Sequence, residues 1–131
     1  MQSLQAIVHL VLKDYPEIQL CIVFGSAASG KISVRSDVDI AVAAHQALPA
    51  YRRLQLTEAL STATKRDVDL IDLVAVSGPI LKQSLTKGVV VQNRDKLLYA
   101  GLISKMLFNQ ADMMPYYDRI LRERRARFLY G

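Results

Sequence analysis

Two pairs of residues with a fixed spacing mark where this chain could do chemistry. Gly25 and Ser26 end one apolar run, and after ten intervening residues Asp37 and Asp39 lead into a second apolar run. An apolar run that ends in Gly-Ser predicts a strand leading into a tight turn, whose free backbone N–H groups can hold a phosphate. Carboxylates at positions i and i+2 of a strand lie on the same face, about 6.6 Å apart along the strand. The pattern predicts a phosphate cradle facing an acidic pair, as metal-dependent phosphoryl or nucleotidyl transfer requires.

The acidic pair is suited to Mg²⁺, which prefers one or two carboxylates together with phosphate oxygens. A third carboxylate on a neighbouring strand would complete a second metal site and help to deprotonate an attacking hydroxyl. The apolar segment 68–76 supplies two candidates, Asp69 and Asp72. Because they are three residues apart on a predicted strand, they lie on opposite faces, and only one of them can join Asp37 and Asp39.

Apolar periodicity and turn residues predict the elements that must position these groups. Strands are expected over residues 18–24, 38–44, 68–76 and 89–92, which are short apolar runs. Helices are expected over residues 3–15, 50–65, 95–110 and about 116–129, with a short helix that starts near Pro79 and has Gly88 as its C-terminal cap. This order predicts an α/β fold with a small mixed β-sheet and flanking helices.

We expect a single domain over residues 1–131, in which residues from about 95 to 131 form a helical C-terminal extension. Two of the predicted helices carry an apolar stripe that should face the core. On the helix over residues 50–65 this stripe consists of Leu54, Ala59, Leu60 and Ala63. On the helix over residues 95–110 it consists of Leu97, Leu98, Leu102, Met106 and Leu107.

Composition places the chain among soluble globular proteins, because 51% of its residues are apolar and 22% are charged. No segment approaches the roughly 18 apolar residues of a membrane span, so we expect a cytoplasmic protein that does not bind membranes. Cys21 is the one cysteine, which excludes an internal disulfide. The net charge of +5 reflects a cluster of arginines at positions 119, 122, 124, 125 and 127. Because no aromatic residues interleave with them, we expect this cluster to face solvent or a partner and not to bind nucleic acid directly.

One further polar residue lies beside a predicted strand. His45 follows the strand over residues 38–44 and could touch a base or a phosphate. No second motif accompanies it, so we expect a solvated side chain.

Gly25-Ser26, the ten-residue spacer and Asp37-Val38-Asp39 together resemble the motif of the DNA polymerase beta-like nucleotidyltransferase superfamily. The likeness covers about residues 18–92 and includes Val68-Asp69-Leu70, which is similar to the strand that carries the third aspartate of that family. Length and layout resemble the minimal nucleotidyltransferase branch, and specifically the MntA-type antitoxins that pair with HEPN-domain toxins. The resemblance implies the nucleotidyltransferase fold.

The resemblance also implies roles for the residues of the motif. Gly25 and Ser26 would hold the triphosphate of ATP, whereas Asp37, Asp39 and Asp69 would bind Mg²⁺ and serve catalysis.

Two positions after Gly-Ser depart from the family. Many relatives have an aromatic residue or arginine directly after Gly-Ser and an arginine two positions further on, where this chain has Ala27 and Ser29. Another basic group, such as Lys31 or Arg35, would then have to balance the triphosphate charge.

The activity that the resemblance implies is Mg²⁺-dependent transfer of AMP from ATP to a hydroxyl. The acceptor would be a tyrosine of a cognate HEPN ribonuclease toxin, with which the chain would form a hetero-oligomer as its antitoxin. Two alternatives stay open: a stand-alone nucleotidyltransferase for a small molecule such as an aminoglycoside, and a non-catalytic antitoxin that acts by occlusion. A chain of 131 residues leaves no room for a separate acceptor-binding domain, which favours a protein acceptor.

Overall fold

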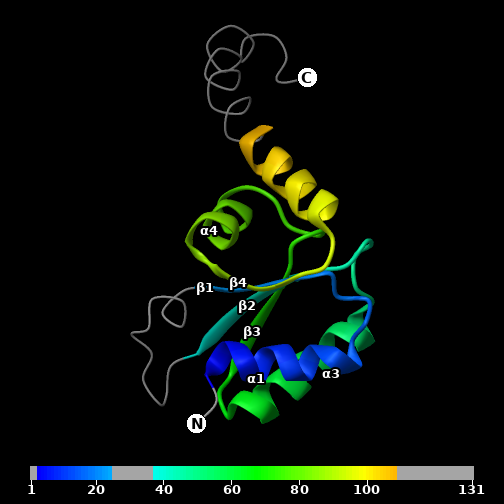
Figure 1. Cartoon of the computed structure of the whole chain (residues 1–131), viewed down its shortest axis with the longest axis vertical. Coiled ribbons are helices and arrows are strands. Elements are labelled where there is room, and N and C mark those ends of the chain that lie inside the picture. The colour runs from blue at the N-terminus through cyan, green and yellow to red at the C-terminus, as the bar shows by residue number, and fades with distance from the viewer. Residues whose placement is uncertain (1–2, 25–36, 109–131) are drawn as a thin grey trace, which may run out of the picture.

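A four-stranded sheet forms the centre of the molecule. The computed structural model describes residues 3–24 and 37–108. The strands are β1 Leu20–Phe24, β2 Val38–Ala43, β3 Val68–Asp72 and β4 Val89–Asn93, and they lie in the order β3-β2-β1-β4 (Figure 1). β1 is antiparallel to both β2 and β4, whereas β2 and β3 are parallel. The predicted α/β class with a small mixed sheet is confirmed.

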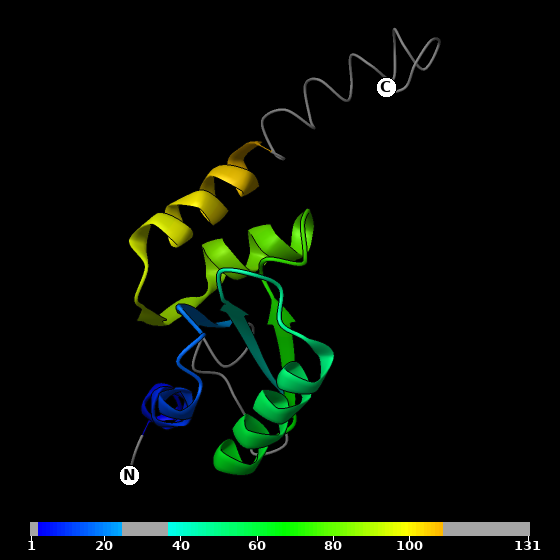
Figure 2. The same cartoon turned by 90° about the vertical axis from the view of Figure 1, so that its right-hand side faces the viewer.

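Helices cover both faces of this sheet, so the fold has three layers. On one face lie α1 (Leu4–Val11), which continues into the 3₁₀ turn Leu12–Asp14, and α3 (Ala50–Thr64). The other face carries α4 (Pro79–Lys87) and the helix over residues 96–108, which we call the C-terminal helix (Figures 1 and 2). None of the described helices is long and apolar enough to cross a membrane.

Alternating strand side chains build a separate apolar core on each face. Val23, Ile40 and Val42 pack against α1 and α3, whereas Ile22, Phe24 and Ala41 pack beneath α4 and the C-terminal helix. All five residues of β1 are buried because β1 lies in the middle of the sheet. Cys21 on this strand is free, and burial raises the pKa of its thiol to about 12, so the thiol remains protonated as a small apolar side chain.

The predicted apolar stripes of two helices are partly wrong. On α3, Leu54 is 61% exposed, and the buried positions are Leu56, Leu60 and Thr64. On the C-terminal helix, Leu102 and Met106 are buried as expected, but Leu97 and Leu107 are 85% and 53% exposed. Leu97 and Leu107 are each adjacent to a residue of the core, Leu98 and Met106, and adjacent residues on a helix point about 100° apart. On α3, Leu54 lies two positions from the buried Leu56 and therefore points about 200° away from it.

Three of the predicted strands are shorter in the structure, and for β2 the difference is one residue, because it ends at Ala43 and not at residue 44. β1 begins at Leu20 and not at residue 18, and β3 ends at Asp72 and not at residue 76. The carboxylate of Asp72 accepts a hydrogen bond from the backbone N–H of Val74 at 3.0 Å, which favours a turn directly after the strand.

Gly88 ends α4 for a different reason from the one expected. Its φ of −93° and ψ of 166° are extended values, not those of a left-handed helix cap. A Cβ at this position would lie only 2.1 Å from Cγ2 of Ile22 and 2.7 Å from the carbonyl oxygen of Ser84. Glycine is therefore required because α4 and β1 approach each other closely here.

The described residues test only part of the predicted C-terminal extension. The C-terminal helix is present over residues 96–108, but the expected helix over about 116–129 and the arginine cluster lie outside the described residues. The assignment of residues 1–131 to one domain stays a prediction.

Candidate active site

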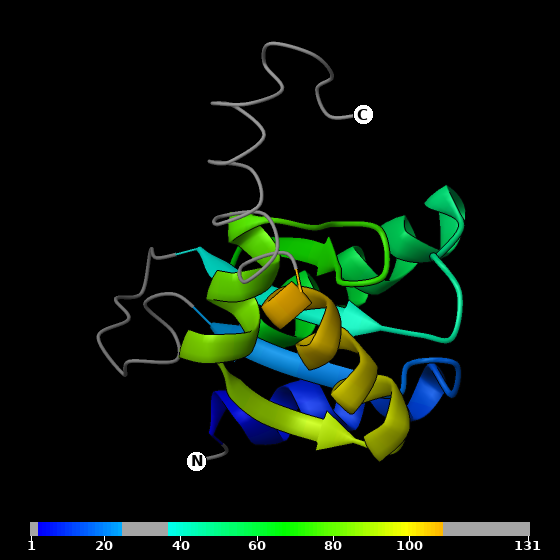
Figure 3. The same ribbon diagram turned by 90° about the horizontal axis from the view of Figure 1, so that it is seen from above.

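Three strand ends meet at one edge of the sheet, and this edge carries the predicted acids. β1 ends there at Phe24, whereas β2 and β3 begin there, because β1 runs antiparallel to β2 and β2 runs parallel to β3. In register, Asp39 lies opposite Phe24 on one side and opposite Asp69 on the other. Asp37 directly precedes β2 and is exposed. Viewed from above, α4 and the C-terminal helix lie over one face of the sheet (Figure 3).

The structure separates the two candidates for the third acid. Asp39 and Asp69 are paired across β2 and β3, and both have the parity of the residues that pack beneath α4, such as Ala41. Asp72 has the opposite parity, is 5% exposed, and accepts hydrogen bonds from the N–H groups of Leu48 at 2.8 Å and Val74 at 3.0 Å. Asp69 therefore lies beside Asp39, whereas both oxygens of Asp72 hold backbone on the other side of the sheet.

Like charges crowd the acidic edge. Burial, followed by the neighbouring carboxylates of Asp69 and Asp37, raises the pKa of Asp39 above its ordinary value of 3.8. Each of these effects disfavours the ionised form of Asp39. A cation bound at this edge would remove the repulsion, so the electrostatics of the site favour binding a positively charged group.

The carboxylates at this edge fit a magnesium ion that takes some of its ligands from the protein and the others from a substrate. Within residues 3–24 and 37–108, no three His, Cys, Asp or Glu side chains converge closely enough to form a ready-made metal cluster. Magnesium does not need such a cluster, because it uses one or two carboxylates and takes its remaining ligands from phosphate oxygens and water. Asp39 together with Asp37 or Asp69 supplies that number of carboxylates.

The phosphate-binding part of the prediction is not tested by the structure. Gly25 and Ser26 follow β1 directly in sequence, but they lie outside the described residues, as do Lys31 and Arg35.

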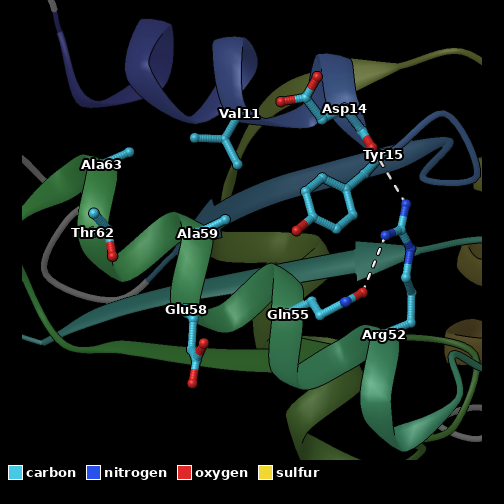
Figure 4. A pocket seen from close by; sticks show the side chains of 9 residues that line it. All are labelled: Val11, Asp14, Tyr15, Arg52, Gln55, Glu58, Ala59, Thr62 and Ala63. Carbon is cyan, nitrogen blue, oxygen red and sulfur yellow. Dashed lines mark hydrogen bonds between the residues drawn. The ribbon is translucent and has the colours of Figure 1, made fainter.

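A hollow in the described part of the chain lies on the opposite face of the sheet from Asp39 and Asp69. It has a volume of about 600 Å³ and lies between α1 and α3 (Figure 4). The guanidinium of Arg52 lies 4.3 Å from the ring centroid of Tyr15 and forms an ion pair with Glu17, which lowers the pKa of Glu17. Arg52 therefore joins α3 to the segment that follows α1. The acids of the predicted site play no part in this hollow.

His45 is solvated as expected, since 65% of its side chain is exposed, but it also has a partner that the sequence did not indicate. Its Nε2 lies 2.7 Å from Oδ2 of Asp95, and the hydrogen bond from His45 lowers the pKa of Asp95. The other oxygen of Asp95 accepts hydrogen bonds from the N–H groups of Leu97 and Leu98, both at 3.0 Å, and so caps the C-terminal helix. The pair lies where β2 ends, away from the acids at its beginning, and it anchors the helix. The sequence signal for the cap is an aspartate directly before an apolar helix.

A sheet edge with paired carboxylates beside the end of a central strand is an arrangement suited to nucleotidyl transfer, and the family comparison agrees. The family model described as "Polymerase beta, Nucleotidyltransferase" matches residues 7–97. The chain therefore belongs to the polymerase beta nucleotidyltransferase family and is a nucleotidyltransferase.

Individual relatives narrow the class further. The protein adenylyltransferase MntA of Shewanella oneidensis is 32% identical over 124 residues, which cover 92% of this chain and 89% of that protein. A chain from the crystal structure of a toxin-antitoxin with AMP-PNP is 30% identical, with a TM-score of 0.71, and the match covers 89% of this chain and 98% of that one. A chain from a complex of tri-AMPylated Shewanella oneidensis HEPN toxin with MNT antitoxin is also 30% identical, with a TM-score of 0.65 and coverages of 90% and 96%.

Proposed function

We propose that this chain transfers AMP from ATP to a tyrosine hydroxyl of a HEPN-domain toxin and thereby acts as its antitoxin. The observation that carries the proposal is the pairing of Asp39 with Asp69 across β2 and β3, with Asp37 at the start of β2. The similarity to the adenylyltransferase MntA and to an antitoxin chain crystallised with a tri-AMPylated toxin supports AMP as the transferred group and a protein as the acceptor.

In this proposal each acid has a distinct task. Asp37 and Asp39 hold Mg²⁺, which when bound supplies positive charge that balances the phosphates of ATP. Asp69 accepts the proton of the attacking tyrosine. The tyrosine oxygen forms a bond to the α-phosphorus, the bond from that phosphorus to the bridging oxygen breaks, and pyrophosphate leaves. Gly25 and Ser26 bind the triphosphate. ATP as the donor is supported by the neighbour crystallised with AMP-PNP.

A raised pKa on Asp39 fits this task. Repulsion among the carboxylates weakens the folded protein, but the same negative charge favours binding of a divalent cation. We place the reaction in the cytoplasm, where ATP is available.

The C-terminal helix offers a surface on which the toxin would pack. It carries large apolar side chains that no other part of the described chain covers: Leu97 is 85% exposed, Leu107 is 53% exposed and Phe108 is 66% exposed. Between them lies Gly101, where an added Cβ would meet no atom within 4 Å. A flat centre flanked by apolar side chains suits close packing of another helix. We place the toxin here because this helix covers the same face of the sheet that carries Asp39 and Asp69.

Intact-mass analysis tests the proposed reaction. A cognate HEPN-domain toxin is incubated with the purified chain, ATP and Mg²⁺, and its mass should increase by one or more adenylyl groups. The double variant Asp37→Ala/Asp39→Ala should leave the mass unchanged. Full neutralisation of the toxin by that variant would contradict the proposal and support occlusion without catalysis. Adenylylation of an antibiotic in the absence of any partner would instead support the small-molecule transferase.

A further inference from the structure

The acidic edge requires positive charge from elsewhere in the protein if it is to hold a nucleoside triphosphate. Asp39 is paired with Asp69 across two strands and Asp37 directly precedes β2, so three carboxylates gather at this edge, and a triphosphate brings additional negative charge. One divalent cation does not neutralise three carboxylates and a triphosphate together, so a basic side chain close to the edge would strengthen nucleotide binding. This requirement directs attention to the lysines of α4, which covers the face that carries Asp39 and Asp69.

Lys87 is the last residue of α4, and the end of α4 is fixed close to the acidic edge. Gly88, which follows it, approaches β1 so closely that a Cβ would lie 2.1 Å from Cγ2 of Ile22 and 3.2 Å from the carbonyl oxygen of Val23. Val89 is paired with Val23 in the sheet. The next residue of β1, Phe24, is the direct neighbour of Asp39. Lys87 therefore lies two residues before Val89, the strand residue that is paired next to the end of β1.

The side chain of Lys87 is available for a ligand. It is exposed, and among residues 3–24 and 37–108 it forms no hydrogen bond or ion pair. Lys82, the other lysine of α4, is also exposed. Because the two lysines are five positions apart, their side chains are turned from each other by about 140° around the helix axis and begin about 7.5 Å apart along it. They lie on opposite flanks of the buried stripe formed by Leu81 and Ser84, so only one of them can face the acidic edge.

We propose that Lys87 binds the β- and γ-phosphates of the nucleoside triphosphate that this site uses. This inference rests on the proposed function and adds a residue that the sequence pattern did not indicate. A lysine ammonium is a compact point charge on a flexible stem, and it can follow the phosphates as pyrophosphate forms and leaves. Lys87 thus contributes a positive charge from α4 to a site to which β2 and β3 contribute carboxylates.

Direct nucleotide binding to the isolated chain tests the inference without any partner. Isothermal titration with Mg²⁺ and AMP-PNP is compared with titration with Mg²⁺ and AMP, which lacks the β- and γ-phosphates. Lys87→Ala should raise the Kd for AMP-PNP about tenfold and leave the Kd for AMP unchanged, the magnitude expected for one charge-assisted contact. Lys87→Arg should restore most of the affinity for AMP-PNP. Lys82→Ala is the matched control and should bind both nucleotides like the unmodified chain.

The outcomes separate this inference from the proposed function. Equal affinity of the Lys87→Ala variant and the unmodified chain for AMP-PNP would overturn the inference alone. An equal loss of affinity for AMP, or an equal effect of Lys82→Ala, would likewise overturn it, because the effect would then not concern the terminal phosphates. Failure of the unmodified chain to bind AMP-PNP with Mg²⁺ would overturn the proposed function and this inference together.

Discussion

Replacing each of two aspartates on the same strand by asparagine should change stability in opposite directions. Asp69 is exposed and lies opposite Asp39, whose pKa it raises, so its charge destabilises the folded state. Asp72 is 5% exposed, and each of its two oxygens accepts a hydrogen bond from a different backbone N–H. Asparagine has only one such oxygen, so Asp72→Asn leaves one of these two N–H groups, which are buried or partly buried, without an acceptor.

The magnitudes follow from these contacts. Relief of one like-charge pair across neighbouring strands is worth about 0.2–1 kcal/mol, so Asp69→Asn should raise the Tm by about 1–4 °C. An unsatisfied buried donor costs about 1–3 kcal/mol, so Asp72→Asn should lower the Tm by about 4–12 °C. Added salt should reduce the gain from Asp69→Asn, because salt screens interactions between exposed charges.

Thermal unfolding followed by circular dichroism, at neutral pH and without metal or nucleotide, measures both shifts. AMP transfer is then measured well below both transition temperatures. Asp69→Asn should abolish transfer although it stabilises the fold, whereas Asp72→Asn should retain transfer per folded molecule. The reasoning is refuted if Asp69→Asn lowers the Tm as Asp72→Asn does, or if Asp72→Asn is the variant that selectively loses transfer.

Three further predictions concern other parts of the structure. The Tm of Asp39→Asn minus the Tm of the unmodified chain should be near zero below pH 3.8 and become positive as pH rises through the raised pKa of Asp39. The reason is that the folded state binds the proton of Asp39 more tightly than the unfolded chain does. A Tm difference that does not change with pH would contradict this. Gly88→Ala should lower the free energy of unfolding by about 1–3 kcal/mol in chemical denaturation, because its Cβ would overlap Ile22, whereas Gly101→Ala in an open helical position should raise it by about 0.5–1 kcal/mol. In a pull-down with the HEPN-domain protein, Leu97→Glu should weaken binding at least tenfold, and equal weakening by Leu54→Glu on α3 would argue against the C-terminal helix as the binding surface.

Local sequence patterns predicted the sheet and its acidic edge but not which side of each helix is buried. The strands could be recognised because short apolar runs bounded by turn residues allow few other structures. Strand parity predicted that only one of Asp69 and Asp72 could join Asp39, and the resemblance of Val68-Asp69-Leu70 to the strand of the family selected Asp69, which the structure pairs with Asp39. The orientation of α3 is set by its packing against α1 and the sheet, so a choice between Leu54 and Leu56 depends on contacts that are distant in sequence.

Gly88 also shows what a local sequence pattern does not predict. The sequence correctly indicated that a helix ends there, because glycine is common after the last helical residue. The reason for glycine is nevertheless tertiary, since Ile22 lies where a Cβ would be. The position of Lys87 depends on this contact, and that is why no sequence pattern indicated it.

The two faces of the sheet differ in what they do for the molecule. On the face of α1 and α3, Arg52 is paired with Glu17, and both oxygens of Asp72 accept hydrogen bonds from backbone N–H groups. On the face of α4, Asp39 and Asp69 repel each other, and Lys87 has no partner within the described chain. Like charges that repel each other on one face lower stability, and under the proposed function a bound cation would compensate the acids and the phosphates of the nucleotide would compensate the lysine. The stabilising effect of Asp69→Asn and the loss of AMP-PNP affinity in Lys87→Ala are therefore two consequences of the same arrangement.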